Sequence, residues 1–377
     1  MKTIYPYQTI GIIGGGQLAR MMCIAAKAMG YYTVVLDPTP NCPAGQVSDG
    51  EITAAYDDLA AIKRLAEITD IITYEFENID VAALEWLCDN AYLPQGSETL
   101  RISRHRFLEK TTISKMGIPV AEFLLINDAA DFDKKVADNL VTYPSILKTT
   151  TLGYDGKGQI VLRSEADLPH ARALAESSEC ILEKFVDFER EVSVIVARST
   201  TGEVKTFPVA ENIHVNNILH LSIVPARVSD AVAKEAEEVA KTIASSLGSV
   251  GVMGVEMFVT AKGIVVNEIA PRPHNSGHFS IDACITSQFE QHIRAVCGLP
   301  LGVTDLHTPV VMVNILGNHM NKEQLHDLSR FTPLLPHGKL HLYGKAAAVD
   351  GRKMGHFNVL GDVENALEKI NAAKIWD

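Results

Sequence analysis

The sequence predicts two fold classes in one chain, α/β in the first hundred residues and α+β after them. Short β-branched runs at 9–14 and 32–37 flank a helical pattern at 17–29, which is the order of a βαβ unit. Farther along, glycine-containing hairpins replace the crossover helices. We therefore expect a parallel sheet covered by helices on both faces, then a mostly antiparallel sheet, and a small β-rich module at the C-terminus.

The rest of the first hundred residues repeats the alternation of strand and helix. A longer helical stretch at 97–116 leads out of this part, and Gly117-Ile118-Pro119 ends it because proline cannot continue a helix. The other elements expected here are helices at 57–68 and 80–89 and strands at 70–76 and 91–95.

The middle of the chain predicts two hairpins. A strand at 143–149, a glycine-dense turn at 152–159 and an extended run at 160–163 form the first. The second consists of VGVMGVEMFVT and IVVNEIA and follows a helix at 230–247. The other elements expected here are a helix at 165–177 and strands at 180–186 and 190–199.

Charge and composition exclude several classes of protein. The 377 residues include 34 basic and 46 acidic side chains, and a net charge of −12 repels a phosphate backbone, so we expect neither nucleic acid nor a membrane as a partner. The six cysteines show no C-x-x-C spacing, which favours reduced thiols over a zinc or redox site. The N-terminus lacks a signal-peptide pattern, and no apolar run is of membrane-spanning length. A cytoplasmic protein is expected.

A glycine motif, Gly14-Gly15-Gly16-Gln17-Leu18-Ala19, stands between the first predicted strand and helix, with Asp37 at the end of the next strand. This G-x-G-x-x-A pattern is typical of dinucleotide binding, in which N–H groups at the helix start bind phosphate and the acidic residue binds a ribose hydroxyl. Two other interpretations stay open. One is a tight turn that lets strand and helix pack closely, and the other is a different phosphate ligand at the same helix N-terminus.

A second glycine-rich segment follows Lys148. Gly153, Gly156 and Gly158 let the backbone fold over a ligand, and Lys148 and Lys157 supply positive charge for an oligophosphate. The segment does not match G-x-x-x-x-G-K-[ST], so it is not a Walker A loop. A mobile surface hairpin with solvated lysines is the alternative.

The late hairpin is expected to place two acidic residues opposite each other. Its connection, 261–263, has three residues and ends in glycine, as one common hairpin class does, which would pair Thr260 with Ile264. Counting outward along both strands then places Glu256 opposite Glu268.

Phe258 and Val266 are expected on the same face as this acidic pair. Like charges directly opposed on one face destabilise a sheet, so a cation is needed between them. Oxygen ligands favour Mg²⁺, which binds one or two carboxylates together with substrate phosphates. The alternative is that Arg272 or a lysine compensates the pair, or that one carboxylate is protonated.

Two further segments concentrate groups that suit an anionic ligand. Residues 271–278, PRPHNSGH, are held extended by two prolines and present an Arg fork, two imidazoles and an amide. The second segment contains Lys345, Arg352, Lys353 and His356 and is either a solvated turn or a phosphate site.

Together these motifs resemble one family. GGGQLARM, ITYEFENI, GYDGKGQ, EKFVDFEREVSVIVAR, VNEIAPRPHNSGH and GRKMGH are similar, in this order, to motifs of the ATP-grasp enzymes that make 5-(carboxyamino)imidazole ribonucleotide. The resemblance implies that bicarbonate is joined to the amine of 5-aminoimidazole ribonucleotide through carboxyphosphate, with ATP hydrolysed to ADP and phosphate, in purine biosynthesis. It also implies Mg²⁺, with Mn²⁺ as an alternative, and a homodimer.

The resemblance further implies an ATP-grasp fold in four parts. These are a Rossmann-like N-terminal domain at 1–105, a lid subdomain at 106–187, a catalytic subdomain with an antiparallel sheet at 188–317, and a small β-rich domain at 318–377. In such proteins the N-terminal βαβ unit is not a nicotinamide site.

Site residues follow from the resemblance by position. The ATP site is expected to contain Arg106, Lys148, Gly153, Tyr154, Asp155, Gly156, Lys157, Gly158, Gln159, Glu183, Lys184, Phe185, Val186, Glu191, His214, Asn267 and Glu268. The substrate side is expected to contain Glu75, Tyr154, Asp155, Arg272, His274, Asn275, Ser276, Lys345 and Arg352. The expected metal ligands are Glu256 and Glu268, and the expected catalytic residues are Arg272, Glu256, Glu268 and Lys353.

Within these sets, Lys148 and Arg106 are expected on the ATP phosphates, 183–186 on adenine and Glu191 on the ribose. The run SRHRFLEK departs from the family, which more often has Gln-Asp-Arg, so the resemblance gives Arg104 and His105 no role.

Two other functions stay open. One is a nicotinamide-dependent oxidoreductase that uses Gly14 to Ala19 and Asp37, and the other is a sensor that binds ATP without turnover. Titration with NADH tests the first, and phosphate release that depends on the ribonucleotide tests the second.

Overall fold

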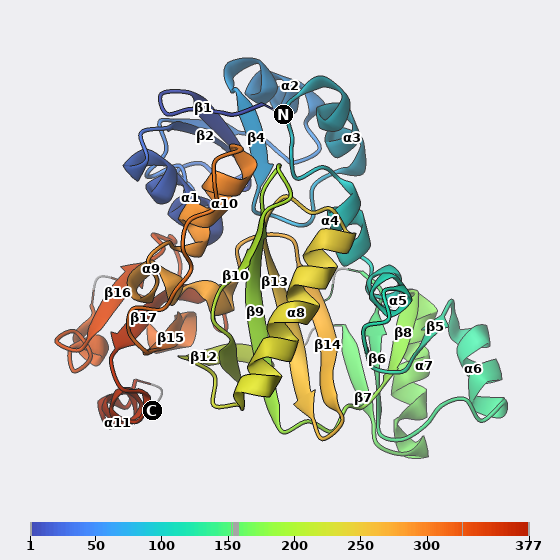
Figure 1. Cartoon of the computed structure of the whole chain (residues 1–377). Helices are drawn as coiled ribbons and strands as arrows, with labels where there is room; N and C mark the ends of the chain where they lie inside the picture. The colour runs from blue at the N-terminus through green and yellow to red at the C-terminus, as the bar shows by residue number, and fades with distance from the viewer. Residues whose placement is uncertain (1, 152, 154–157, 326, 376–377) are drawn as a thin grey trace.

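The strands form three sheets in a computed structural model that describes residues 2–151, 153, 158–325 and 327–375. In Figure 1 the parallel sheet lies at the top, a small antiparallel sheet at the lower right, and a large sheet runs through the centre toward the C-terminal strands at the left. The predicted combination of α/β and α+β parts is confirmed.

The N-terminal domain is a parallel sheet in the order β3-β2-β1-β4. Asp58 and Asp80 start helices α2 and α3, because their carboxylates accept N–H groups of the first turn. The elements are β1 (Thr9–Ile13), α1 (Gln17–Ala28), β2 (Tyr32–Asp37), β3 (Gly50–Thr53), α2 (Leu59–Ile68), β4 (Ile71–Tyr74) and α3 (Val81–Asn90).

Residues 91–95 are not a strand, which corrects the expectation. Pro94 has no N–H to give to a ladder. The segment runs beside β4 as a loop, held by a bond from the Ile72 N–H to the Tyr92 carbonyl (2.9 Å) and by Gln95, whose Oε1 accepts the Tyr74 N–H (3.1 Å).

The helical stretch expected at 97–116 is two helices, α4 (Glu98–Ser103) and α5 (Arg106–Lys115). His105 is extended between them, and its Nε2 lies 3.0 Å from the carboxylate of Glu179. Arg104 donates from Nη1 to a backbone carbonyl of the N-terminal domain at 2.7 Å. Arg104 and His105 therefore form the joint between the N-terminal domain and the next one.

The small antiparallel sheet has the order β5-β8-β6-β7. The first predicted hairpin is confirmed, since β6 pairs with β7 and Lys148 lies opposite Gln159. The elements are β5 (Phe123–Ile126), α6 (Ala129–Ala137), β6 (Ser145–Thr149), β7 (Gln159–Leu162), a 3₁₀ turn at Glu165–Asp167, α7 (Leu168–Ser177) and β8 (Cys180–Lys184).

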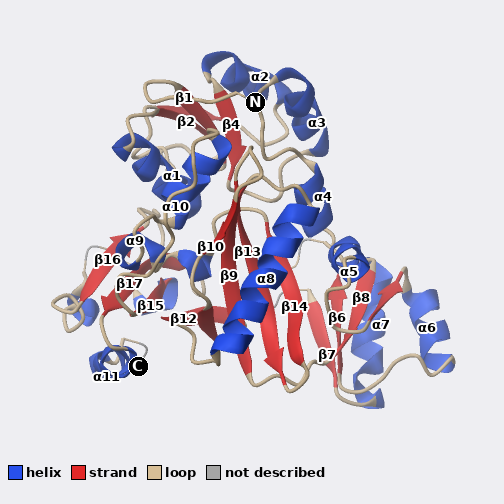
Figure 2. Cartoon of the chain, in the orientation of Figure 1, coloured by secondary structure: helices blue, strands red, loops and turns tan. Residues whose placement is uncertain are grey.

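The central sheet has the order β14-β13-β9-β11-β12-β15-β17-β16, with β10 paired to β9. Helix α8 lies across one face (Figure 2) and packs Ala236, Ala240 and Ile243 onto it. The elements are β9 (Arg190–Arg198), β10 (Val204–Thr206), β11 (Ala210–Val215), β12 (Ile218–Val224), α8 (Asp230–Ser246), β13 (Gly251–Thr260), β14 (Gly263–Ala270), α9 (Ser280–Ala283), α10 (Gln288–Val296), β15 (Val310–Leu316), β16 (Gly338–Leu342), β17 (Lys353–Leu360) and α11 (Val363–Ala373), with 3₁₀ turns at Asn275–Gly277, Gly317–His319 and Ser329–Phe331.

The C-terminal strands continue the central sheet. β15 pairs with β12, where Leu221 lies opposite Val313, and on its other side with β17. The boundary expected at 317/318 follows β15 directly, and β16 and β17 then return to the same sheet. The division into four domains stays a prediction.

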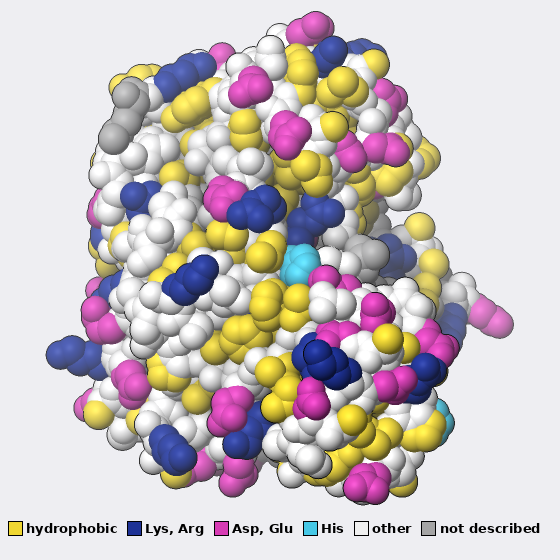
Figure 3. Space-filling view, turned by 90° about the vertical axis from the view of Figure 1, so that its right-hand side faces the viewer, with side chains coloured by type: hydrophobic (Ala, Val, Ile, Leu, Met, Phe, Trp, Pro, Cys, Tyr) yellow, Lys and Arg dark blue, Asp and Glu magenta, His cyan; other side chains and the backbone are white. Residues whose placement is uncertain are grey.

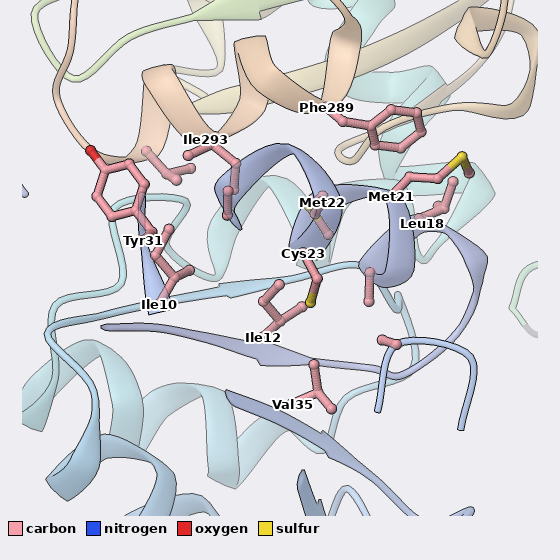
Figure 4. Close-up of a cluster of buried hydrophobic side chains, with 14 of the residues drawn as sticks. Ile10, Ile12, Leu18, Met21, Met22, Cys23, Tyr31, Val35, Phe289 and Ile293 are labelled. Carbon is pink, nitrogen blue, oxygen red and sulfur yellow. The ribbon is translucent and has the colours of Figure 1, made fainter. Parts of the chain in front are cut away.

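A buried apolar cluster joins the N-terminal domain to the central body. Figure 4 shows Phe289 and Ile293 of α10 facing α1, where Met21 and Met22 lie, above the sheet residue Ile12. Separating the two parts would expose this apolar area to water, which is unfavourable. The start of α1 is therefore held in place relative to the segment that leads into α10.

The surface matches the charge composition. On the face in Figure 3, basic and acidic side chains are interspersed rather than gathered into one basic patch. No helix formed by the described residues is long and apolar enough to cross a membrane.

Candidate active site

The acidic pair expected in the late hairpin is present, although the hairpin reaches it by a different route. The connection has two residues, so Thr260 pairs with Gly263 rather than with the next residue. Asn267 is then an extra residue in β14, and this β-bulge restores the register, so that Glu256 pairs with Glu268. The two deviations cancel at the acidic pair.

The bulge changes which side chains share a sheet face with Glu256 and Glu268. Phe258 is opposite Val265, whereas Val266 is fully buried and packs in the apolar core with Ile264. Val266 therefore lies on the other face, which corrects the expectation. Lys110 donates from Nζ to the carbonyl of Asn267 at 2.8 Å and so holds the bulge in place.

The electrostatics of the pair favour a cation. Burial raises the pKa of Glu256 to about 7, and the charge of Glu268 adds to the rise. Arg272 does not compensate it, because its Nη2 pairs with Glu77 at 2.7 Å. His274 Nε2 lies 3.3 Å from Glu256 Oε1, but burial lowers the pKa of His274 well below its usual range, so the ring is neutral. A cation between the two carboxylates would lower the pKa of Glu256.

Glu256 and Glu268 are the protein ligands that this hairpin offers to a metal. Among the residues that the structure describes, no group of three or more His, Cys, Asp or Glu side chains could hold a metal ion. Two carboxylates that leave the other positions to water and phosphate oxygens suit Mg²⁺. The residues fit the metal that the resemblance implies.

A buried ion-pair cluster involves the expected phosphate ligand Lys148. Glu183 Oε2 lies 3.1 Å from Lys148 Nζ and 3.4 Å from Lys110 Nζ. Burial alone would raise the pKa of Glu183, but the two ammonium groups outweigh it and the pKa is lowered. The Glu183 side chain is therefore occupied by two lysines, and the contact of 183–186 with adenine stays a prediction.

Lys110 and its neighbour Glu109 were missed by the sequence reasoning. Both are buried, and burial together with the charge of Glu268 raises the pKa of Glu109 well above its usual range. The signal was present in the run FLEK, where two charged residues occur on a helix that packs on β14.

Residues expected around adenine and ribose follow β8. Lys184 ends the strand, and Phe185 and Val186 continue it without regular structure, with Phe185 exposed. Glu191 Oε2 lies 2.6 Å from His214 Nδ1. Burial of His214 opposes protonation, but the carboxylate of Glu191 outweighs it and raises the pKa of His214.

The ends of the glycine loop lie close to Arg106. Arg106 donates from Nη1 to the Thr149 carbonyl (2.9 Å) and from Nη2 to the Gly153 carbonyl (2.8 Å). Gly158 closes the loop by accepting the Thr149 N–H at 2.9 Å, and Gln159 begins β7. The other loop residues expected in the site, Tyr154, Asp155, Gly156 and Lys157, lie outside the described residues.

The N–H groups at the start of α1 are bound by carboxylates of this chain. The Gly15 N–H donates to Asp37 at 2.8 Å, and the Gly16 and Ala19 N–H groups donate to Glu75 at 2.6 and 3.0 Å. A pyrophosphate would need the same donors and would be repelled by the carboxylates. A Cβ on Gly16 would lie 2.6 Å from Glu75 Oε1, so the glycine permits a close approach. The structure favours the tight-turn interpretation.

In the polar segment after β14, Asn275 and His278 have buried hydrogen-bonding atoms without a partner among the described residues. Asn275 is buried, and both atoms of its amide lack a partner among the described residues. The Ser276 hydroxyl, in contrast, lies 2.7 Å from the Ser193 hydroxyl and 2.9 Å from His274 Nδ1. Asn275 is therefore available to a ligand, whereas the Ser276 side chain serves the protein.

The C-terminal basic group reaches the same region. Lys345 Nζ donates to the Lys353 carbonyl at 2.7 Å. Burial and then the charge of Arg352 lower the pKa of Lys345 to about 8, and the charge of Glu75 opposes this, which places Lys345 near the N-terminal domain. His356 does not belong to the group, because it is fully buried and its pKa is well below the usual range.

Three family models match successive parts of the chain. They describe a ribonucleotide synthetase preATP-grasp domain at residues 7–104, an ATP-grasp domain at 111–289, and a phosphoribosylaminoimidazole carboxylase C-terminal domain at 310–370. The N5-carboxyaminoimidazole ribonucleotide synthase of Bacillus subtilis (strain 168) is 53% identical over 365 residues, which cover 97% of this chain and 94% of the relative. The chain belongs to the N5-carboxyaminoimidazole ribonucleotide synthase family of ATP-grasp enzymes.

Solved structures of N5-carboxyaminoimidazole ribonucleotide synthases agree with this. The Staphylococcus aureus synthetase complexed with ADP matches with a TM-score of 0.92 and 42% identity, covering 99% of this chain and 98% of that one. The Aspergillus clavatus synthase complexed with ADP and 5-aminoimidazole ribonucleotide matches with a TM-score of 0.90 and 33% identity, covering 98% of each chain. The chain is an ATP-grasp ligase of purine biosynthesis that carries out an ATP-dependent carboxylation.

Proposed function

We propose that the enzyme carboxylates 5-aminoimidazole ribonucleotide with bicarbonate at the expense of ATP. The observation that carries the proposal is the pairing of Glu256 with Glu268, because it creates a cation site suited to a triphosphate. A bicarbonate oxygen bonds to the γ-phosphorus of ATP as the bond to ADP breaks, which forms carboxyphosphate. The amine nitrogen then bonds to the carboxyl carbon, phosphate leaves, and the amine loses a proton.

The proposed ATP-binding residues lie at two places, beside Glu183 of β8 and at the acidic pair. Lys148 is held by Glu183 at 3.1 Å and would meet the phosphates as an oriented ammonium group. Glu256 and Glu268 would hold Mg²⁺, which when bound neutralises charge on the phosphate oxygens. The loop that starts at Gly153 would exclude water from the carboxyphosphate.

Arg272 is the proposed catalytic cation of the second step. A guanidinium stabilises a planar anion by two parallel hydrogen bonds, which suits the carboxyl group of carboxyphosphate. Burial raises the pKa of Glu256 and the charge of Lys353 opposes that rise, whereas burial lowers the pKa of His274 and the charge of Lys353 adds to the fall, so Lys353 lies near the same centre.

The ribonucleotide is proposed to lie between the N-terminal domain and the C-terminal strands. Lys345 and Arg352 would bind its 5′-phosphate, and Asn275 has free donor and acceptor groups for its polar atoms. Glu75 would face its imidazole. The Aspergillus clavatus relative, which was solved with ADP and 5-aminoimidazole ribonucleotide, supports this choice of substrate.

An omission series tests the reaction. ADP formation is measured with ATP, Mg²⁺, bicarbonate and 5-aminoimidazole ribonucleotide, and each component is left out in turn. The proposal expects each omission to abolish most of the turnover. ADP formation that does not depend on the ribonucleotide would contradict it, and ATP binding without turnover would support the sensor.

We also infer a homodimer from the resemblance. Light scattering is expected to give twice the chain mass of 41.0 kDa. A single-chain mass at assay concentration would contradict the inference.

A further inference from the structure

We propose that four buried side chains, Ser222, Asn212, Ser193 and Ser276, set the tautomer of His274 and aim its Nε2–H at Glu256. The inference rests on the function proposed above and adds positioning residues to it. Ser222, Asn212 and Ser193 lie outside every set of site residues that the sequence predicted.

The four side chains form one continuous series of hydrogen bonds. Ser222 Oγ lies 2.9 Å from Asn212 Oδ1, and Asn212 Nδ2 lies 2.9 Å from Ser193 Oγ. Ser193 Oγ lies 2.7 Å from Ser276 Oγ. The series crosses neighbouring strands β12, β11 and β9 and leaves the sheet at the turn that follows β14.

The series ends at the two nitrogens of His274. Ser276 Oγ lies 2.9 Å from Nδ1, and Nε2 lies 3.3 Å from Glu256 Oε1. Ser193 is directly opposite Glu256 in the pairing of β9 with β13, so the series passes beside the acidic pair before it ends at His274.

The direction of the hydrogen bonds is set at Asn212. Its amide oxygen accepts from the Ser222 hydroxyl, and its amide nitrogen donates to the Ser193 hydroxyl. Each hydroxyl has one proton, so Ser193 donates to Ser276 and Ser276 donates to Nδ1. The backbone N–H of Ser276, 3.4 Å from Nδ1, points at the same acceptor. The remaining proton of the neutral ring is on Nε2, facing Glu256.

Burial keeps the donor and acceptor roles along the series fixed. The exposed fractions of Ser193, Ser222 and Ser276 are 1%, 0% and 0%, and Asn212 is 6% exposed. A buried polar group that loses its partner is costly, so reversing one bond requires reversing all of them. Water does not compete along the series.

The orientation matters for the acidic pair. The Nε2–H, 3.3 Å from Glu256 Oε1, would attract the carboxylate and favour its position opposite Glu268. The other tautomer would present a lone pair to a carboxylate oxygen, which is repulsive, and the carboxylate would turn away. The series therefore connects the interior of the sheet to the position of the proposed metal ligand.

The substitution Asn212→Asp tests the direction. A carboxylate accepts from both Ser222 and Ser193, so the series must reverse and His274 must donate from Nδ1. Asn314→Asp is the matched control, because Asn314 is also buried, in β15 of the same sheet, where its amide donates to the Leu219 carbonyl at 2.9 Å.

The readout is the tautomer itself. Long-range ¹H–¹⁵N correlation spectra of the full chain with ¹⁵N-labelled histidine show which ring nitrogen is protonated, and His274→Gln assigns the signal among the 13 histidines. We expect Nε2–H in the wild type and in Asn314→Asp, and Nδ1–H in Asn212→Asp. In steady-state assays, Asn212→Asp should lower kcat about ten- to hundredfold, as loss of an outer hydrogen-bond partner does, with the KM for ATP changed less.

Two results would overturn the inference: an Nδ1–H tautomer in the wild type, or an unchanged tautomer in folded Asn212→Asp. If Asn212→Asp does not fold, Ser193→Ala is the test, because it interrupts the series without adding charge. We expect this variant to populate Nδ1–H, and a spectrum identical to that of the wild type would overturn the inference. The spectra need no turnover, so failure of the proposed reaction in the omission series is a separate result.

Discussion

Arg272 and Glu77 form an ion pair of 2.7 Å between the segment after β14 and the N-terminal domain. Their side chains are 25% and 28% exposed, so the pair is open to an anionic ligand. Partly exposed pairs contribute ~1 kcal/mol or less to stability. Arg272 can therefore exchange Glu77 for a substrate anion at small cost.

This exchange predicts unequal effects of two substitutions. Arg272→Lys, which keeps the charge but removes the fork, should lower kcat by roughly a hundredfold, as loss of one donor to a developing anion does. Glu77→Gln should change kcat less than tenfold, because it removes the resting partner alone. Ribonucleotide-dependent ADP formation measures both. Equal losses in the two variants would show that the ion pair itself is needed for catalysis.

Lys345 predicts a pH dependence of substrate affinity. Its pKa is lowered to about 8 by burial and the neighbouring Arg352, so its charge is present below pH 8 and is lost as pH rises through that value. The KM for the ribonucleotide should therefore rise above pH 8, while the KM for ATP stays nearly constant. Lys345→Arg is the control, since arginine stays charged and should flatten the dependence. A wild-type KM that is constant from pH 7 to 9 would contradict the phosphate assignment.

Gly16 predicts a loss of stability. In Gly16→Ala the new Cβ would lie 2.6 Å from Glu75 Oε1, so the carboxylate must move away from the helix start. We expect the free energy of unfolding to fall by about 1–3 kcal/mol, as for overpacking in a core. Gly50→Ala is the control, because its Cβ would meet Val34 at an ordinary 3.4 Å. Urea unfolding compares the two, and equal midpoints would refute the close-packing role.

Occupation of the α1 N-terminus predicts that NADH does not bind there. Asp37 and Glu75 already accept the N–H groups of Gly15, Gly16 and Ala19. Titration of the protein with NADH should show no saturable change in nicotinamide fluorescence. Saturation at micromolar NADH would restore the oxidoreductase as a candidate.

The acidic pair shows how much of the late hairpin could be predicted from the sequence. The alternation of residues along two strands placed Glu256 opposite Glu268, although the shorter connection and the bulge were both unforeseen, because their two register shifts cancel. The bulge at Asn267 was not predictable, since the Lys110 ammonium group that donates to the Asn267 carbonyl comes from a helix more than a hundred residues earlier. The prediction of the sheet face on which Val266 lies was wrong for the same reason.

Other parts of the site depended on contacts that no local pattern reveals. Glu183 was expected at adenine, yet two distant lysines engage its side chain. The glycine motif has the sequence of a dinucleotide site, and the carboxylate of Glu75, 59 residues beyond Gly16, changes its role. The segment 91–95 has strand-like residues, but Pro94 and the side chain of Gln95 make it a loop.

Binding of Mn²⁺ in place of Mg²⁺ tests the central claim most directly, because the unpaired electrons of Mn²⁺ report binding without turnover. Electron paramagnetic resonance would follow free Mn²⁺ in titrations of the enzyme with ADP present, for the wild type, Glu256→Gln and Glu268→Gln. If the two carboxylates hold the metal together, each substitution should weaken Mn²⁺ binding at least tenfold while the fold is retained. Wild-type Mn²⁺ affinity in both folded variants would contradict the claim.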